Sequence, residues 1–116
     1  MLKIKRVYEK PEKSDGLRIL VDRLWPRGVG KKEAKIDHWM KEIAPSSNLR
    51  KWFAHKDERW PEFKRRYFKE LKDKNEPLKQ LKDSGKNKNV TLLYGAKDTE
   101  RNNAKVLLEF ISKQRR

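Results

Sequence analysis

The sequence predicts a single three-layered α/β domain over residues 1–116, with a small, largely parallel sheet of about three or four strands and about five helices. Short apolar runs rich in β-branched and aromatic residues indicate strands, and between them apolar residues recur every three to four positions, which indicates helices. The length suits one domain of ordinary size and is too short for two.

The first part of the chain is expected to supply two strands. Between Leu2 and Tyr8, apolar residues alternate with basic ones in the two-residue rhythm of a half-buried strand. Residues 17–25 (LRILVDRLW) are more uniformly apolar, as expected of a central strand that is covered on both faces. The loop over 9–16 is short for a helical crossover, so these two strands could instead form an antiparallel pair.

The middle of the chain is expected to be helical. Ile36, Trp39, Met40 and Ile43 fall at helical spacing and predict a helix that ends before Pro45. Further helices are expected over 49–53, capped by Ser46 or Ser47, over 60–71, and over 75–84, ending at Gly85.

The last part of the chain predicts a strand followed by a helix. Residues 90–96 (VTLLYGA) form the third apolar run, and their number favours a strand. The final helix is expected to begin near Asp98 or Thr99, either of which can cap it, and to carry an apolar face through Ile111.

Composition excludes several classes of protein chemistry. There is no cysteine and there are only two histidines, which excludes a disulfide framework, a thiolate zinc site and a multi-histidine metal cage, so no metal is expected. No apolar run is long enough to cross a bilayer and no secretory signal is recognisable at the first residues, so we expect a cytoplasmic protein without a membrane partner.

The glycine-containing segment 28–32 (GVGKK) raises the question of a phosphate-binding loop. The Walker A pattern requires Gly and Ser or Thr where this chain has Trp25 and Lys32, and the dinucleotide fingerprint requires Gly where it has Glu33. No cofactor is therefore expected. The alternative to a phosphate-binding loop is that residues 28–32 form a flexible turn with solvated lysines.

Polar residues that follow the two central strands form a more informative group. Asp22, Arg23 and Arg27 follow the first strand, and Lys97 and Asp98 follow the second. If the strands are parallel neighbours, these side chains meet in one crevice at the carboxyl edge of the sheet, where ligands of open α/β sheets bind. The alternative is a structural Asp–Arg ion pair that ties two loops together.

This crevice is predicted to bind a phosphate-bearing small molecule or a nucleotide, and it raises the possibility of an enzyme. The expected anion contacts are Arg23, Arg27, Lys97 and Asn102, and the expected acid/base groups are Asp22, Asp98 and His55. His55 has the alternative role of a partly buried structural histidine.

The net charge of +15 suggests a second function, that of a non-catalytic nucleic-acid-binding accessory protein. The basic residues that would contact nucleic acid are Lys64, Arg65, Arg66, Lys69, Lys72 and the tail 113–116. Trp25 and Trp52 are the expected exposed tryptophans, whereas Trp39 and Trp60 are expected to pack in the core. No helix-turn-helix, zinc-finger or RNA-recognition signature is present.

Several motifs together resemble the YeaO-like family, within the domain of unknown function 488 grouping. They are Lys5-Arg6-Val7-Tyr8, GLRILVDRLWPRG at 16–28, LRKWF at 49–53 with His55, WPEF at 60–63 with Tyr67, and TLLYGAKD at 91–98 with Asn102 and Ala104. The resemblance covers nearly the whole chain and implies a compact α/β fold of Rossmann-like character, without implying a particular activity. Many relatives read His-Asn-His where this chain has Arg101-Asn102-Asn103, which argues against a mechanism that needs imidazoles there.

Overall fold

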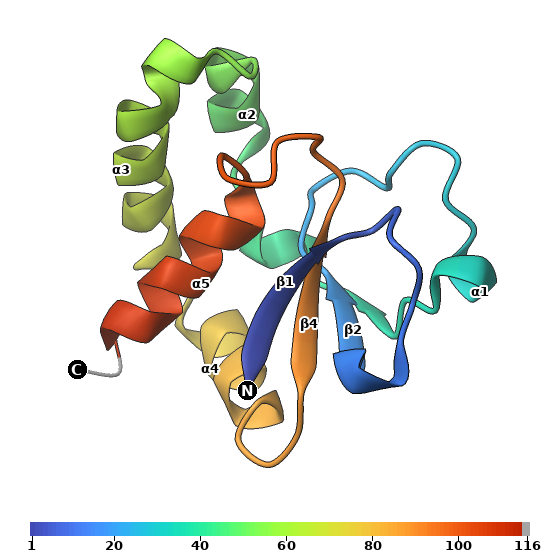
Figure 1. The fold of residues 1–116 in the computed structure, drawn as a ribbon. Coiled ribbons are helices and arrows are strands. Elements are labelled where there is room, and N and C mark those ends of the chain that lie inside the picture. Colours follow the sequence, from blue (N-terminus) through green and yellow to red (C-terminus); the bar gives the residue numbers. More distant parts are fainter. Residues whose placement is uncertain (115–116) are drawn as a thin grey trace.

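The computed structural model of the protein describes residues 1–114, with side chains through residue 113, and shows a small Rossmann-like α/β domain built on one four-stranded sheet (Figure 1). The strands lie in the order β1-β4-β2-β3, and every pair is parallel. Their bounds are Leu2–Arg6 for β1, Leu17–Leu20 for β2, His38–Trp39 for β3 and Val90–Tyr94 for β4. The predicted α/β class and parallel sheet are confirmed.

Strand β4 is central and pairs with both N-terminal strands. Val90 lies opposite Leu2 of β1 on one side and opposite Leu17 of β2 on the other. The alternative of an antiparallel pair between β1 and β2 is therefore wrong. The two strands are not neighbours, and because all strands run the same way, the chain leaves β2 and β4 at the same edge of the sheet.

Within the described residues, five α-helices accompany the sheet. They are α1 (Lys31–Ala34), α2 (Ser47–Phe53), α3 (Trp60–Leu71), α4 (Asn75–Ser84) and α5 (Asn103–Gln114). Helices α2 to α5 cover one face of the sheet, whereas only the short α1 and the loops around it lie on the other side (Figure 1). The three layers are thus unequal in thickness.

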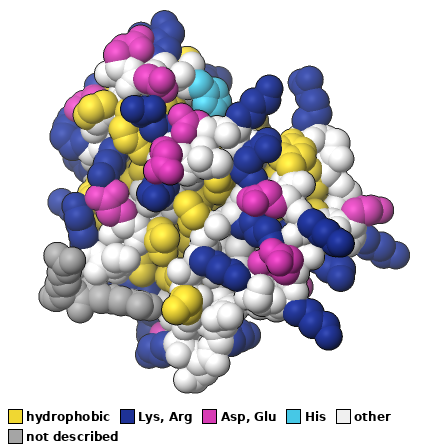
Figure 2. Space-filling model, in the orientation of Figure 1, with side chains coloured by type: hydrophobic (Ala, Val, Ile, Leu, Met, Phe, Trp, Pro, Cys, Tyr) yellow, Lys and Arg dark blue, Asp and Glu magenta, His cyan; other side chains and the backbone are white. Residues whose placement is uncertain are grey.

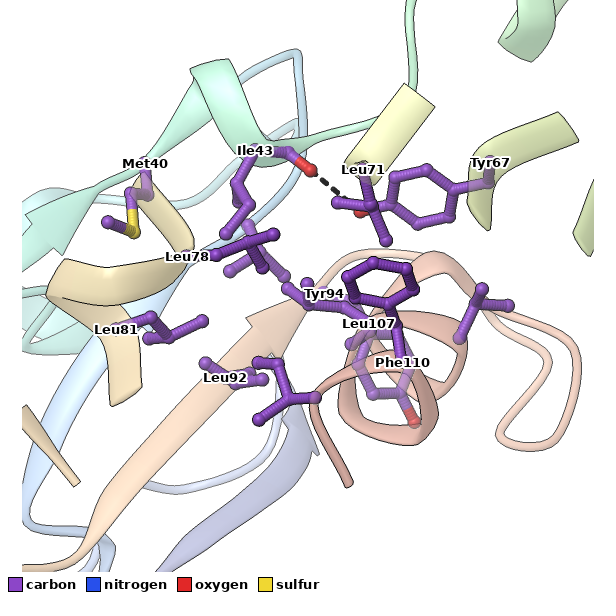
Figure 3. Close-up of a cluster of buried hydrophobic side chains, with 14 of the residues drawn as sticks. Met40, Ile43, Tyr67, Leu71, Leu78, Leu81, Leu92, Tyr94, Leu107 and Phe110 are labelled. Atoms are coloured by element: carbon purple, nitrogen blue, oxygen red, sulfur yellow. Dashed lines mark hydrogen bonds between the residues drawn. The ribbon is translucent and has the colours of Figure 1, made fainter. Parts of the chain in front are cut away.

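The larger hydrophobic core lies between the sheet and helices α2 to α5 (Figure 3). Leu92 and Tyr94 of β4 point into it and meet Leu107 and Phe110 of α5. Tyr67 of α3 is fully buried, and its hydroxyl donates to the carbonyl of Ile43 over 2.7 Å, so its one polar group is satisfied. The hydrogen bond joins α3 to the segment that leads into α2.

The smaller core lies on the opposite face, where Leu20 and Leu93 pack against Val7, Ala34 and Ile36. This face also holds a buried charge cluster. Asp15 and Arg18, which are 1% and 2% exposed, form an ion pair of 2.5 Å, and the ammonium of Lys5 lies 3.2 Å from Asp15. The Arg18 Nε also donates to the carbonyl of Ala34, so the cluster ties β2 to α1.

The helix expected over residues 36–43 is wrong. The chain there forms the short strand β3 and then a 3-10 turn over Lys41–Ile43. Ile36 packs in the smaller core, whereas Met40 and Ile43 pack in the larger one. The apolar residues with helical spacing therefore pack in the cores on both faces of the sheet. The backbone is held by pairing with β2, including Met40 N–H to the Leu20 carbonyl.

Two smaller expectations, on Trp39 and on the start of the final helix, are also wrong. Trp39 does not pack in the core but is 38% exposed on β3, with its indole N–H on the Asp22 carbonyl. The final helix begins later than expected, at Asn103, because Asp98 holds a turn before it and Asn102 caps it. Helix α5 continues to Gln114, and the end of the basic tail, residues 115–116, lies outside the described residues.

Candidate functional site

A cavity of about 300 Å³ opens at the carboxyl edge of the sheet, beyond the ends of β2 and β4. This is the position at which open α/β sheets bind ligands, because loops and helix starts converge there. Its lining includes four arginines, namely Arg23, Arg27, Arg50 and Arg101, together with the carboxylate of Asp22. The cavity is thus strongly cationic around a single acidic group.

Several segments of the chain contribute to this cavity. Strand β2 ends at Leu20, so that residues 21–30 form a loop carrying Asp22, Arg23 and Arg27 rather than the longer strand expected. Arg50 comes from α2, Gly95 and Ala96 follow β4, and Asn102 and Asn103 mark the start of α5.

Helix α2 is fixed in place by Ser46. The Ser46 hydroxyl caps the helix by accepting from the Leu49 N–H over 3.1 Å, and it donates to Glu70 of α3 over 2.6 Å. The Ser46 N–H also donates to the same carboxylate over 2.9 Å. These bonds anchor α2 against α3, with Arg50 on its cavity side.

The arginines differ in how much of their hydrogen-bonding capacity the fold uses. Arg23 donates from Nε to the Pro45 carbonyl over 2.9 Å and from Nη2 to the Ala44 carbonyl over 3.3 Å, so it mainly joins two loops. The guanidinium groups of Arg27 and Arg50 make no hydrogen bond or ion pair with any residue from 1 to 113. They therefore retain their full sets of donors for an anion.

Asp22 is the acidic group of the cavity. Its Oδ2 accepts from the Gly95 N–H over 2.9 Å, and a Cβ on Gly95 would lie only 3.1 Å from this oxygen. Burial raises the pKa of Asp22 above its ordinary value, although hydrogen bonds from Gly95 and Asn103 and the charge of Arg50 act in the opposite direction. A side chain at position 95 would therefore require the Asp22 carboxylate to shift by a few tenths of an ångström.

Lys97 and Asp98 line a second cavity of about 440 Å³, which adjoins the first along Phe53, His55 and Arg101. Asp98 Oδ1 accepts from the N–H groups of Glu100 and Arg101, both over 2.9 Å, and these bonds hold the pKa of Asp98 below its usual value. Asp98 therefore stabilises the turn before α5.

His55 and Asn102 occupy different environments. His55 is exposed, has a φ of +55° and lines both cavities beside the ring of Phe53. Asn102 is buried: its Nδ2 donates to the Asp98 carbonyl over 3.0 Å and its Oδ1 accepts from the Lys105 N–H over 2.9 Å. The amide of Asn102 thus closes the turn and caps α5.

The predicted site residues fall into two neighbouring groups. Asp22, Arg23, Arg27, His55 and Asn102 line the first cavity, whereas Lys97 and Asp98 line only the second. Sequence reasoning missed Arg50 and Arg101 as candidate anion contacts.

The signal for Arg50 was present in the sequence. It lies beside Leu49 and one helical turn before Phe53, both of which are buried, so a helix over 49–53 already placed it at the border of the core. What the sequence did not show is where that helix packs.

The described part of the chain has neither a cluster of metal ligands nor a membrane-spanning helix. Residues 1–114 contain no group of three or more His, Asp or Glu side chains placed to hold a metal ion. Nor does any helix in the same range have the length and apolar character needed to span a membrane.

Comparison with known proteins gives consistent results along the whole chain. A family model described as "Inactive DUF488-N3 subclade" (DUF488-N3i) matches residues 1–116. "Uncharacterized protein YeaO" of Escherichia coli (strain K12) is 46% identical over 110 residues, covering 95% of this chain and 96% of that protein. "Uncharacterized protein Rv3073c" of Mycobacterium tuberculosis (strain ATCC 25618 / H37Rv) is 37% identical over 111 residues, covering 96% and 93%. No solved structure matches the chain. The chain belongs to the YeaO-like DUF488 family, in the subclade described as inactive.

Proposed function

We propose that this protein binds a phosphate-bearing small molecule or a nucleotide in the cavity at the carboxyl edge of its sheet, without transforming it. One observation carries the proposal: Arg27 and Arg50 line the same cavity with guanidinium groups that no described side chain or carbonyl occupies. A planar fork of donors matches the oxygens of a phosphate, and two such groups converging on one cavity suit an anion better than any neutral ligand.

Binding without catalysis is favoured by three further observations. The family model that matches the chain is described as inactive. The chain has Arg101-Asn102-Asn103 at the start of α5, where the family resemblance implies His-Asn-His, so it offers no imidazole there for acid/base chemistry. Asp98, the second carboxylate expected to act as an acid or base, accepts hydrogen bonds from two backbone N–H groups and lines the adjoining cavity.

The alternative of a nucleic-acid-binding accessory protein has weaker support on α3. Arg65 and Arg66 both bind Glu62, whose pKa falls to about 2 because of these bonds, and Lys64 binds Glu109. Figure 2 shows basic side chains spread over the visible face and interleaved with acidic ones rather than gathered in one patch. This distribution favours charged side chains that only face solvent over a defined nucleic-acid interface.

The proposal is tested with the variant Arg27→Ala. The Arg27 side chain is exposed and has no protein partner, so its loss should leave the melting temperature unchanged within about 2 °C. The affinity for inorganic phosphate, measured by isothermal titration calorimetry, should fall about tenfold or more, because one charge-assisted contact is removed.

A matched control is Lys79→Ala, which removes the same charge from an exposed position on α4 that does not line either cavity. This variant should bind phosphate as the unmodified protein does. Equal weakening by both substitutions would show that only the overall charge matters and would refute the cavity as the binding site.

A further inference from the structure

Asp22 has no obvious role in a cavity that binds anions, because a carboxylate repels them. Its Oδ2 accepts from Gly95 N–H over 2.9 Å, and the Asn103 amide, which donates to the Val21 carbonyl over 2.9 Å, also acts on the Asp22 carboxylate as a donor. An ionised carboxylate has about four lone-pair positions, so two protein donors leave part of its acceptor capacity facing the cavity.

The remaining acceptor positions discriminate between anions that are alike in charge. Sulfate carries only acceptor oxygens, and one of them placed beside Asp22 would leave two buried acceptors facing each other without a hydrogen. An anion that carries an O–H group can donate to Asp22 instead. Arg23 and Arg50 supply positive charge on the same cavity and offset the net repulsion.

We propose that Asp22 makes the cavity selective for anions that carry an O–H donor beside their negative charge, an inference that rests on the proposed function. Its ligands are then hydrogenphosphate, or a phosphate ester with a sugar hydroxyl within reach, while sulfate is excluded. A site that is built around a hydrogen bond rejects ligands lacking the matching group more strongly than a site built on charge alone.

The test compares four probes at pH 8 by isothermal titration calorimetry: hydrogenphosphate, sulfate, methyl phosphate and ribose 5-phosphate. At this pH sulfate and the two phosphate esters are dianions, since the second pKa of a phosphate ester is about 6, and inorganic phosphate is mainly hydrogenphosphate. Sulfate and methyl phosphate then have no O–H, hydrogenphosphate has one on its phosphorus, and ribose 5-phosphate has them on its sugar. Hydrogenphosphate should bind at least about tenfold more tightly than sulfate or methyl phosphate.

Ribose 5-phosphate identifies the source of the donor. Binding as tight as that of hydrogenphosphate would show that a sugar hydroxyl reaches Asp22. Binding as weak as that of methyl phosphate would show that the phosphate itself must supply the O–H. Either result supports selectivity for a donor.

The substitution Asp22→Asn tests the residue directly. The Asn oxygen can still accept from Gly95, while its amide offers a donor to the ligand, so sulfate should bind more tightly and the preference for hydrogenphosphate over sulfate should fall to about twofold or less. Arg27→Ala is the matched control, since it should weaken both anions by the same factor and preserve the preference.

The outcomes separate this inference from the proposed function. Equal binding of sulfate and hydrogenphosphate by the unmodified protein, or an unchanged preference in Asp22→Asn, overturns the role of Asp22 while the anion site stands. Failure of every probe to bind overturns the proposed function itself. If Asp22→Asn does not fold, the comparison of probes on the unmodified protein decides alone.

Discussion

Asp15 shows how a single buried carboxylate organises the thin side of the fold. It is 1% exposed and lies within 3.2 Å of Lys5 and 2.5 Å of Arg18, while its Oδ2 also accepts from the Glu12 N–H. Burial alone would raise the pKa of Asp15, but the hydrogen bonds from Glu12, Lys5 and Arg18 outweigh it and hold the pKa below its ordinary value of 3.8. The ionised form is therefore the one that the fold stabilises.

This lowered pKa predicts a pH-dependent contribution to stability. Because the folded pKa lies below the unfolded one, the contribution is complete above about pH 4 and is lost as the pH falls through the folded value. At pH 7, Asp15→Asn should lower the free energy of unfolding by about 3 kcal/mol, since it leaves the Arg18 charge buried without its partner. Urea denaturation at pH 7 and pH 3 measures the effect.

The difference in the free energy of unfolding between the unmodified protein and Asp15→Asn should be smaller at pH 3 than at pH 7. Glu12→Gln, which changes the exposed partner of Lys5, is the control and should have little effect on stability at either pH. A difference for Asp15→Asn that stays the same at both values would show that Asp15 contributes by packing rather than by charge.

Among the helices and strands, the sequence predicted those whose apolar residues all pack on one side of the sheet. The prediction failed where apolar residues at helical spacing pack on both sides. Helix α3 was predicted from its apolar face, because the apolar residues of that face all pack in or against the larger core. In residues 36–43 the same spacing arises because Ile36 and Met40 belong to opposite faces of the sheet. Pairing with a strand far away in the sequence decides between these structures, and periodicity does not report it.

The turn into β2 depends on the conformation of Gly16. Gly16 has φ +64° and ψ −136°, a conformation that is essentially restricted to glycine, and a Cβ there would lie 2.1 Å from the carbonyl oxygen of Asn89. Leu17 N–H donates to that same carbonyl, which connects the starts of β2 and β4. Gly16→Ala should therefore lower the free energy of unfolding by about 3 kcal/mol or more.

Gly28→Ala is the matched control for Gly16→Ala in thermal or urea denaturation. Gly28 also has a positive φ, +74°, but a Cβ there meets nothing within 4 Å. Only the backbone strain should remain, at a cost of about 1 kcal/mol. Equal losses for the two variants would mean that the approach of Gly16 to Asn89 contributes nothing.

At the scale of the whole molecule, the sequence identified which edge of the sheet to search but not what completes the cavity there. The residues after β2 and β4 lie at the same edge because these strands are parallel, but Lys97 and Asp98 line the adjoining cavity rather than the one that holds Asp22. Arg50 reaches the cavity only through the packing of α2 against α3 by Ser46 and Glu70. That contact joins residues 24 positions apart, and no local pattern contains it.

The net charge of +15 allows the two proposed functions to be separated by experiment. If the protein binds nucleic acid through α3, its affinity for duplex DNA should fall with salt at a slope of about −0.9 for each phosphate contacted. The triple variant Arg65→Ala, Lys69→Ala, Lys72→Ala should then flatten the slope by less than three contacts would give, because Arg65 is already paired with Glu62. The affinity of the triple variant for hydrogenphosphate should be unchanged, since none of the three residues lines the cavity.

Calorimetry measures hydrogenphosphate binding, and filter-binding assays at about 50 mM salt, where electrostatic binding is strong, measure DNA binding. If the unmodified protein retains no DNA under these conditions, the nucleic-acid function is ruled out and the lysines only form a solvent-exposed charged surface. If the triple variant loses hydrogenphosphate binding, the anion site lies on α3 instead of in the cavity.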